Sequence, residues 1–107
     1  MAMRVLIAVA ALIAIAAPAA AAQAPDGKAL FEANCRKCHG NGQPVPAIKK
    51  MFPEIPKWDA EFFGKRTEDS IVTILTNGKG AHMKSFKQVL KPEEMTAVAR
   101  YIRTLKP

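Results

Sequence analysis

The sequence is poor in cysteine, with only two among its 107 residues, at positions 35 and 38. It has no internal repeat and no convincing alternation of apolar and polar residues, so no β-sheet is predicted. Runs of basic residues never exceed two, and the few aromatic residues do not alternate with lysine and arginine as in a stacking surface for nucleic acid. These absences leave a single small helical domain as the expected fold class.

The first 22 residues have the order of a secretory signal peptide. MAMR is a short positive segment, residues 5–17 are apolar, and residues 18–22, PAAAA, are small residues suited to cleavage. We predict cleavage after Ala22; the alternative is an uncleaved anchor, because residues 5–22 are just long enough to span a bilayer. The prediction is therefore a leader at 1–22, a mature domain at 23–107, and a periplasmic location without stable membrane insertion.

The mature part of the chain is basic. Without Arg4 of the leader it carries fifteen basic and nine acidic side chains. A positive surface attracts acidic partners over a distance. Because export argues against nucleic acid, we expect the partner to be an acidic protein.

The pattern of the mature part predicts an all-α domain with three main helices. These helices are expected at residues 27–39, 68–77 and 92–105. Asp26 and Thr67 are suited to cap the first two, and Pro92 suits the first turn of the third, whose cap position is occupied poorly by Lys91. On the first helix, the residues expected near the apolar face are Ala29, Leu30, Ala33 and Cys38.

Loops are predicted between these helices. Pro44 and Pro46 predict an irregular loop over residues 40–53. One short helical turn is expected around residues 59–63, and a second loop is expected over residues 78–88.

Both cysteines lie in the stretch FEANCRKCHG, residues 31–40, and a histidine follows the second. A disulfide or redox pair of Cys35 and Cys38 suits an oxidising compartment, but thioredoxin-like folds place such a pair within a βαβ pattern, which is absent here. A zinc site would add His39 and His82, although two adjacent residues rarely both reach one tetrahedral ion.

The third hypothesis accounts for every residue of this motif. Cys-x-x-Cys-His is the attachment sequence of c-type haem. On one helical turn the thiols of Cys35 and Cys38 reach the two vinyl groups of a haem and form thioethers, while the His39 imidazole is the proximal iron ligand. Covalent attachment also retains a cofactor that so small a domain cannot fully enclose. We therefore favour one covalently bound haem c.

The second iron ligand is expected from a methionine, whose soft thioether favours ferrous iron. Met83 lies in a glycine-flanked loop, where an apolar side chain has no amphipathic role, and it is the predicted ligand. Met95 lies on the apolar stripe of the last helix and is predicted to be core. Met51 is undecided between core and surface, and His82 is the rival ligand because imidazole also binds iron.

With these features the sequence resembles the small class I cytochromes c of bacteria, over nearly all of residues 26–105. The stretch GKALFEANCRKCHG is similar to their first helix, and NGKGAHMKSF is similar to their methionine loop. The stretch EEMTAVARYIRTL is similar to their last helix. The resemblance implies the cytochrome c fold wrapped around one haem, with His39 and Met83 as iron ligands. It also implies that Tyr101 packs against Gly27 and Phe31.

The resemblance implies further contacts around the haem. The stretch VPAI, residues 45–48, is similar to the family's Gly-Pro-x-Leu segment, with valine in place of glycine. By this likeness the Pro46 carbonyl accepts the proton on His39 Nδ1, and Ile48 packs on the ring. Trp58 is expected either to donate its indole proton to a haem propionate or to pack in the core. Lysine follows Met83, where the family usually has proline.

The predicted function is the transfer of single electrons between acidic redox proteins, such as a dehydrogenase, a reductase or an oxidase. An iron with six ligands has no open position for a substrate, so an enzyme is not predicted. The resemblance implies that Lys37, Lys79, Lys84 and Lys87 surround the exposed haem edge, where they form either a docking surface for acidic partners or an ordinary solvated face. The alternatives are a cytochrome subunit dedicated to one periplasmic dehydrogenase, a ligand-binding sensor, and a thiol-disulfide or metal-binding protein that uses Cys35 and Cys38.

Overall fold

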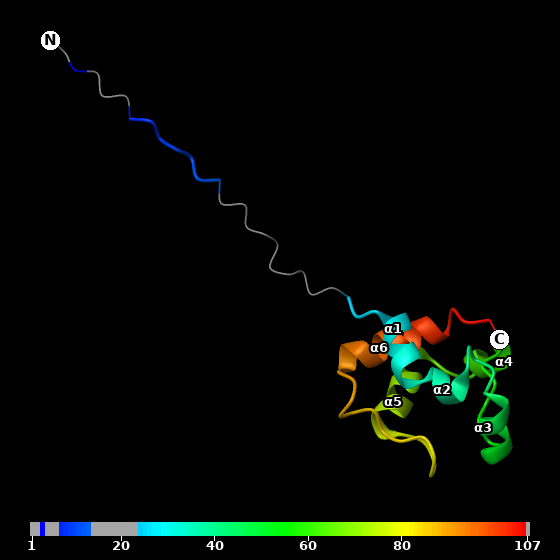
Figure 1. The fold of residues 1–107 in the computed structure, drawn as a ribbon. Helices are drawn as coiled ribbons and strands as arrows, with labels where there is room; N and C mark the ends of the chain where they lie inside the picture. The colour runs from blue at the N-terminus through cyan, green and yellow to red at the C-terminus, as the bar shows by residue number, and fades with distance from the viewer. Residues whose placement is uncertain (1–2, 4–6, 14–23, 107) are drawn as a thin grey trace.

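The computed structural model describes residues 3, 7–13 and 24–106, and all the helices within them lie between residues 27 and 102 (Figure 1). In chain order the helices are α1 (Gly27–Asn34), α2 (Arg36–His39), α3 (Pro46–Met51), α4 (Ala60–Gly64), α5 (Glu68–Asn77) and α6 (Pro92–Ile102). The all-α prediction is confirmed for this part of the chain. The predicted cleavage point after Ala22 lies outside the described residues.

None of the helices in the described ranges is both long enough and apolar enough to cross a membrane.

The helix starts follow the predicted caps. Asp26 and Thr67 each accept a hydrogen bond from the amide three residues later at 3.1 Å, and Asp59 does the same for α4 at 2.9 Å. Each bond satisfies an N–H that the helix itself leaves without a partner. The start of α6 is held differently, because the Glu94 carboxylate accepts the N–H of Lys91 at 2.9 Å. This bond compensates for the poor capping residue at Lys91.

The helix predicted over residues 27–39 is divided in two. Cys35 lies between α1 and α2 with φ −122° and ψ −35°, away from helical geometry. The Cys35 N–H still donates to Phe31 O at 2.8 Å, whereas the Cys38 N–H donates to Cys35 O, three residues back, at 3.2 Å. The last helix is also shorter than predicted and ends at Ile102.

The loop prediction for residues 40–53 was wrong, because α3 occupies residues 46–51. Pro46 is its first residue, where a helix needs no N–H donor and the fixed φ of proline suits the turn. Proline breaks a helix from within, but at this position it starts one.

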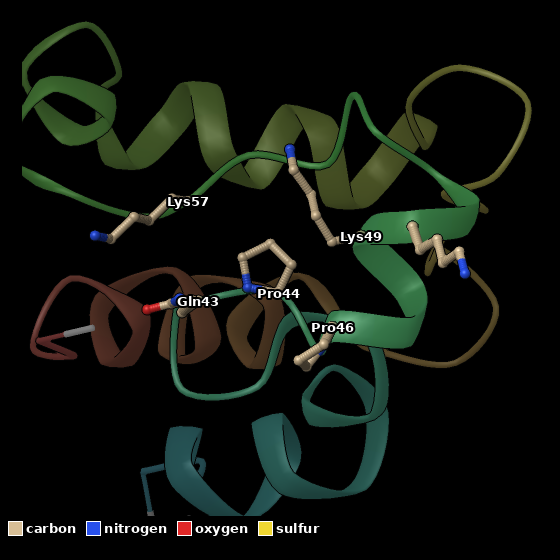
Figure 2. Close-up of a pocket in the computed structure, with 6 residues that line it drawn as sticks. Gln43, Pro44, Pro46, Lys49 and Lys57 are labelled. Atoms are coloured by element: carbon tan, nitrogen blue, oxygen red, sulfur yellow. The ribbon is translucent and has the colours of Figure 1, made fainter.

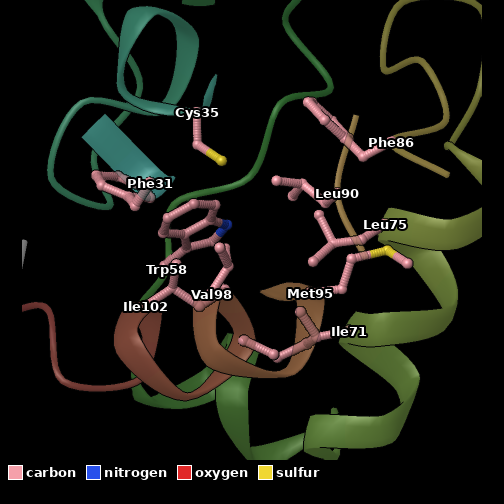
Figure 3. Close-up of a cluster of buried hydrophobic side chains, with 11 residues drawn as sticks. Phe31, Cys35, Trp58, Ile71, Leu75, Phe86, Leu90, Met95, Val98 and Ile102 are labelled. Carbon is pink, nitrogen blue, oxygen red and sulfur yellow. The ribbon is translucent and has the colours of Figure 1, made fainter. Parts of the chain in front are cut away.

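The core forms where α1, α5 and α6 meet (Figure 3). Its buried side chains are Phe31, Cys35, Trp58, Ile71, Leu75, Phe86, Leu90, Met95, Val98, Ala99 and Ile102. Met95 is 3% exposed, which confirms its prediction as core. On α1 it is Phe31 that is fully buried, whereas Ala29 and Ala33, predicted on the apolar face, are exposed.

Helices α1 and α6 lie in close contact at Gly27. A Cβ placed on Gly27 would lie 2.3 Å from Ala97 O and 3.0 Å from Tyr101 Cβ. One turn further along α1, the Phe31 and Tyr101 rings are 5.4 Å apart between centroids. The expected packing of Tyr101 against Gly27 and Phe31 is confirmed, and it places the end of α1, with Cys35, over the core.

Candidate haem site

The three residues of the cysteine-histidine motif lie within one turn. Cys35 joins α1 to α2, and its carbonyl accepts the N–H of Cys38 at 3.2 Å and that of His39 at 3.0 Å. Gly40 ends the turn with a φ of 55°, in the left-handed region that favours glycine. The Val45 N–H then donates to Cys38 O at 3.1 Å, so the following loop folds back onto the motif.

Both thiols are free, and the environment of Cys35 does not activate its thiol. Cys35 is 8% exposed and Cys38 is half-buried. Burial, and in second place the charge of Cys38, raises the pKa of Cys35 to about 11. A redox-active pair instead needs a thiol whose pKa is lowered, because the thiolate is the nucleophile. The thiol-disulfide alternative therefore receives no support from the pKa of Cys35.

The imidazole of His39 is half-buried, and its Nδ1 atom is shielded from solvent. Its Nδ1 has no hydrogen-bond partner. Within the described residues, no other buried side-chain nitrogen or oxygen lacks one. Burial lowers the pKa of His39 to about 4, so the ring is neutral at neutral pH and offers a lone pair. The Pro46 carbonyl is not its acceptor in this structure. A buried polar atom without a partner is costly, so Nδ1 is expected to gain an acceptor when the site is occupied.

Trp58 lies beside His39, from a segment far away in the sequence. The two rings are stacked, with centroids 4.5 Å apart and planes 21° from parallel. Trp58 is 6% exposed and also contacts Phe31 and Phe62, while its backbone N–H donates to Gly42 O at 2.8 Å. Packing in the core, one of its two predicted roles, is therefore observed, and the stack on His39 is a contact that the sequence did not signal.

The two predicted contacts from the VPAI segment lie on α3. Pro46 begins the helix and is exposed, and Ile48 is half-buried in the same helix. Beside them is an open pocket lined by Gln43, Pro44, Pro46, Lys49, Lys50 and Lys57 (Figure 2). Lys49 lines this pocket and donates from Nζ to the carbonyl of Ile55 at 2.9 Å, so α3 is tied to the segment that leads to Trp58.

Met83 lies in the loop over residues 78–86, called the Met83 loop below. It pairs with Lys79 in an antiparallel bridge, with N–H to O distances of 2.8 and 3.3 Å. Its side chain is half-buried and packs against the core. By contrast Met51 is 66% exposed, and the Met95 sulfur is buried and accepts a bond from Thr76 Oγ1 at 3.6 Å. Among the three candidates, Met83 alone combines contact with the core and partial exposure.

His82 is directed to a different neighbour. Its exposed ring lies on Phe52, with centroids 4.2 Å apart, and its Nε2 is 4.0 Å from a Glu54 carboxylate oxygen. No group of three or more His, Cys, Asp or Glu placed to hold a metal ion occurs in the described ranges. The zinc hypothesis with Cys35, Cys38, His39 and His82 therefore has no support. Phe52 carried no signal in the sequence, because it lay in a predicted loop.

Comparison with known proteins identifies the family. The family model described as cytochrome C oxidase, cbb3-type, subunit III matches residues 22–102. Cytochrome c6 of Nostoc sp. (strain PCC 7120 / SAG 25.82 / UTEX 2576) is 38% identical over 89 residues, 83% of this chain and 77% of that protein. The chain belongs to the small class I c-type cytochromes.

Two solved structures give the same result for the fold of this cytochrome. The KustC0563 c-type cytochrome superposes with a TM-score of 0.69 at 31% identity, over 77% of this chain and 99% of the other. Cytochrome c6 from the diatom Phaeodactylum tricornutum superposes with a TM-score of 0.55 at 40% identity, over 73% of this chain and 87% of the other. The cytochrome is therefore a mono-haem electron-transfer protein that carries one covalently bound haem c.

The residues present fit this cofactor. Two free thiols, a neutral imidazole and a half-buried thioether form the donor set of a c-type haem.

Proposed function

We propose that this cytochrome carries single electrons between redox proteins of the periplasm, with its haem attached to Cys35 and Cys38 and its iron held by His39 and Met83. The observation that carries the proposal is a single turn that holds both free thiols and the neutral ring of His39. When bound, the haem supplies the one-electron couple of ferric and ferrous iron.

The motif residues hold the cofactor in two ways. The thiols of Cys35 and Cys38 tether it, so a domain with a small core retains it. The neutral ring of His39 offers Nε2 to the iron and keeps the proton on Nδ1. This bond is absent from the structure, and we propose that the Pro46 carbonyl accepts that proton once the haem is bound, with Ile48 as a packing contact, since both lie on α3 beside the motif loop.

Met83 is proposed as the sixth ligand because its side chain packs against the core while His82 lies on Phe52. A thioether is a soft ligand that favours ferrous iron and raises the reduction potential. With both ligands in place the iron has no open position, so we propose a carrier without enzymatic activity.

Trp58 supports the proximal side of the site. Its ring is stacked on His39 at 4.5 Å, which restricts rotation of the imidazole. A hydrogen bond from its indole N–H to a haem propionate is a second proposed role for the same side chain.

The partners are proposed to be acidic. The docking surface consists of four exposed lysines, Lys37, Lys79, Lys84 and Lys87. A positive surface of this kind raises the association rate with an acidic partner and loses its effect as salt increases. We also propose that residues 1–22 are a cleaved leader and that residues 23–107 form the mature periplasmic domain.

The test is a visible spectrum of the protein made in a host with cytochrome c maturation. After acid-acetone extraction, the sharp band of the reduced haem is expected to stay with the polypeptide. Extraction of the colour would contradict covalent attachment.

The ligand assignment is tested with two methionine variants. Met83→Ala is expected to abolish the weak far-red band of a methionine-ligated ferric haem and to allow tight binding of carbon monoxide. Met51→Ala, at an exposed methionine, is the matched control and is expected to keep the band. A Met83→Ala protein with an unchanged spectrum would contradict the assignment.

A further inference from the structure

The Met83 loop is anchored firmly at its base. The bridge between Lys79 and Met83 closes the loop, and the Phe86 N–H donates to Leu75 O at 2.8 Å. Ser85 Oγ also donates to the carbonyl of Thr76. All these bonds connect residues at or near the end of α5, so they do not hold the far end of the loop.

The tip of the loop, residues 80–82, has little to restrain its backbone. All three residues are exposed, and Gly80 has a φ of 61° with open space where a side chain would lie. No proline occurs between residues 79 and 91. A glycine-containing segment without proline loses much conformational freedom when it is ordered. An ordered tip therefore needs a contact with another part of the fold.

His82 makes that contact. Its ring lies on Phe52 with centroids 4.2 Å apart and planes 32° from parallel, and Glu54 is 4.0 Å from Nε2. Phe52 is itself fixed at the end of α3, because its N–H donates to Ile48 O at 2.8 Å and its carbonyl accepts the N–H of Ile55 at 3.0 Å. The loop tip, yellow in Figure 1, lies toward α3.

We propose that His82 is a positioning residue for Met83. Its contact with Phe52 clamps the tip of the Met83 loop to the end of α3, and this clamp opposes the departure of Met83 from the iron. The inference rests on the proposed function, in which Met83 is the sixth ligand. It gives His82 a role that needs no bond from its imidazole to iron.

The clamp has a measurable consequence for external ligands. Added imidazole binds ferric iron only where Met83 has left, so its apparent affinity is proportional to the fraction of open loop. Loss of an aromatic contact is expected to raise that fraction about threefold to tenfold. His82→Phe keeps an aromatic ring on Phe52 and is expected to stay within about twofold of the native protein.

The experiment titrates the ferric holoprotein with imidazole. We expect His82→Ala and Phe52→Ala each to raise the apparent affinity, and the double variant to raise it no further, because both remove one contact. Gln88→Ala, at an exposed residue just beyond the same loop, is the control and should leave it unchanged. The clamp would be overturned if His82→Ala left the apparent imidazole affinity unchanged. It would also be overturned if the effects of His82→Ala and Phe52→Ala on that affinity were additive in the double variant.

A second readout separates this proposal from the assignment of Met83. The amides of Lys79 and Met83 are both bonded in the bridge, so their hydrogen exchange reports loop opening whichever group binds the iron. We expect exchange to accelerate about threefold to tenfold in His82→Ala. If exchange accelerates in His82→Ala but the spectrum of Met83→Ala is unchanged, Met83 is not the iron ligand, although His82 still holds the loop tip against Phe52. Unchanged exchange, with the far-red band lost in Met83→Ala, would refute the clamp alone.

Discussion

Substitution of Gly27 by alanine tests the contact between α1 and α6. Gly27 is the first residue of α1, and its φ lies outside the left-handed region, so alanine fits its backbone without strain. The added methyl group would nevertheless lie 2.3 Å from Ala97 O and 3.0 Å from Tyr101 Cβ. Only a separation of the two helices can relieve these contacts, because Ala97 O belongs to the backbone of α6.

The expected loss of stability follows from the distances. Non-bonded atoms prefer a separation of about 3.5 Å or more, so the helices must move apart by about 1 Å. Overpacking of this kind costs about 1–3 kcal/mol, and the better helix propensity of alanine returns at most about 1 kcal/mol. We expect a net loss of about 1–2 kcal/mol, which for a domain of this size lowers Tm by about 4–16 °C.

The assay is denaturant and thermal unfolding of the ferric holoprotein, followed by circular dichroism. Gly64→Ala is the matched control, because Gly64 ends α4 and no atom of the surroundings lies within 4 Å of the place that its new methyl group would take. The control is expected to stay within about 0.5 kcal/mol of the native protein. If Gly27→Ala is as stable as the control, the close approach of α1 and α6 described above is wrong.

Three further predictions concern the loop, a cap and the core. Gly78 has a φ of 75°, and a methyl group added there would lie 2.7 Å from Met83 O, so Gly78→Ala should lower the free energy of unfolding by about 2 kcal/mol and weaken the far-red band. Gly80 faces open space, so Gly80→Ala should cost only about 1 kcal/mol and keep the band. Both are measured by unfolding and spectrum; equal losses would contradict the steric argument. Thr67→Ala should cost about 1 kcal/mol in urea unfolding and Thr67→Ser much less, since serine keeps the capping oxygen. Phe31→Ala, at a fully buried position, should cost about 3–5 kcal/mol and reduce the yield of haem-loaded protein; a loss under about 1 kcal/mol would show that the site is not core.

Features that depend on a few neighbouring residues were predictable from the sequence. Asp26 and Thr67 cap their helices through bonds that span three residues, and the haem attachment motif occupies a single turn. Met95 could be assigned to the core because the apolar stripe of one helix shows which side is buried. In each case the physical interaction lies within the segment that carries the pattern, so the pattern is sufficient.

Features that depend on the path of the loops were decided only by tertiary structure. Pro46 starts a helix here, although its local sequence fitted a loop equally well, and Lys49 then ties that helix to the segment beyond it. The stack of Trp58 on His39 and the contact of His82 with Phe52 join residues far apart in the sequence. Nothing in a local pattern specifies such pairs, because they form only once α3 and the loops around it have been placed against the core. The sequence by itself thus determined the cofactor and the starts of α1, α5 and α6, and the packing of the loops determined what holds His39 and, by our proposal, Met83 in place.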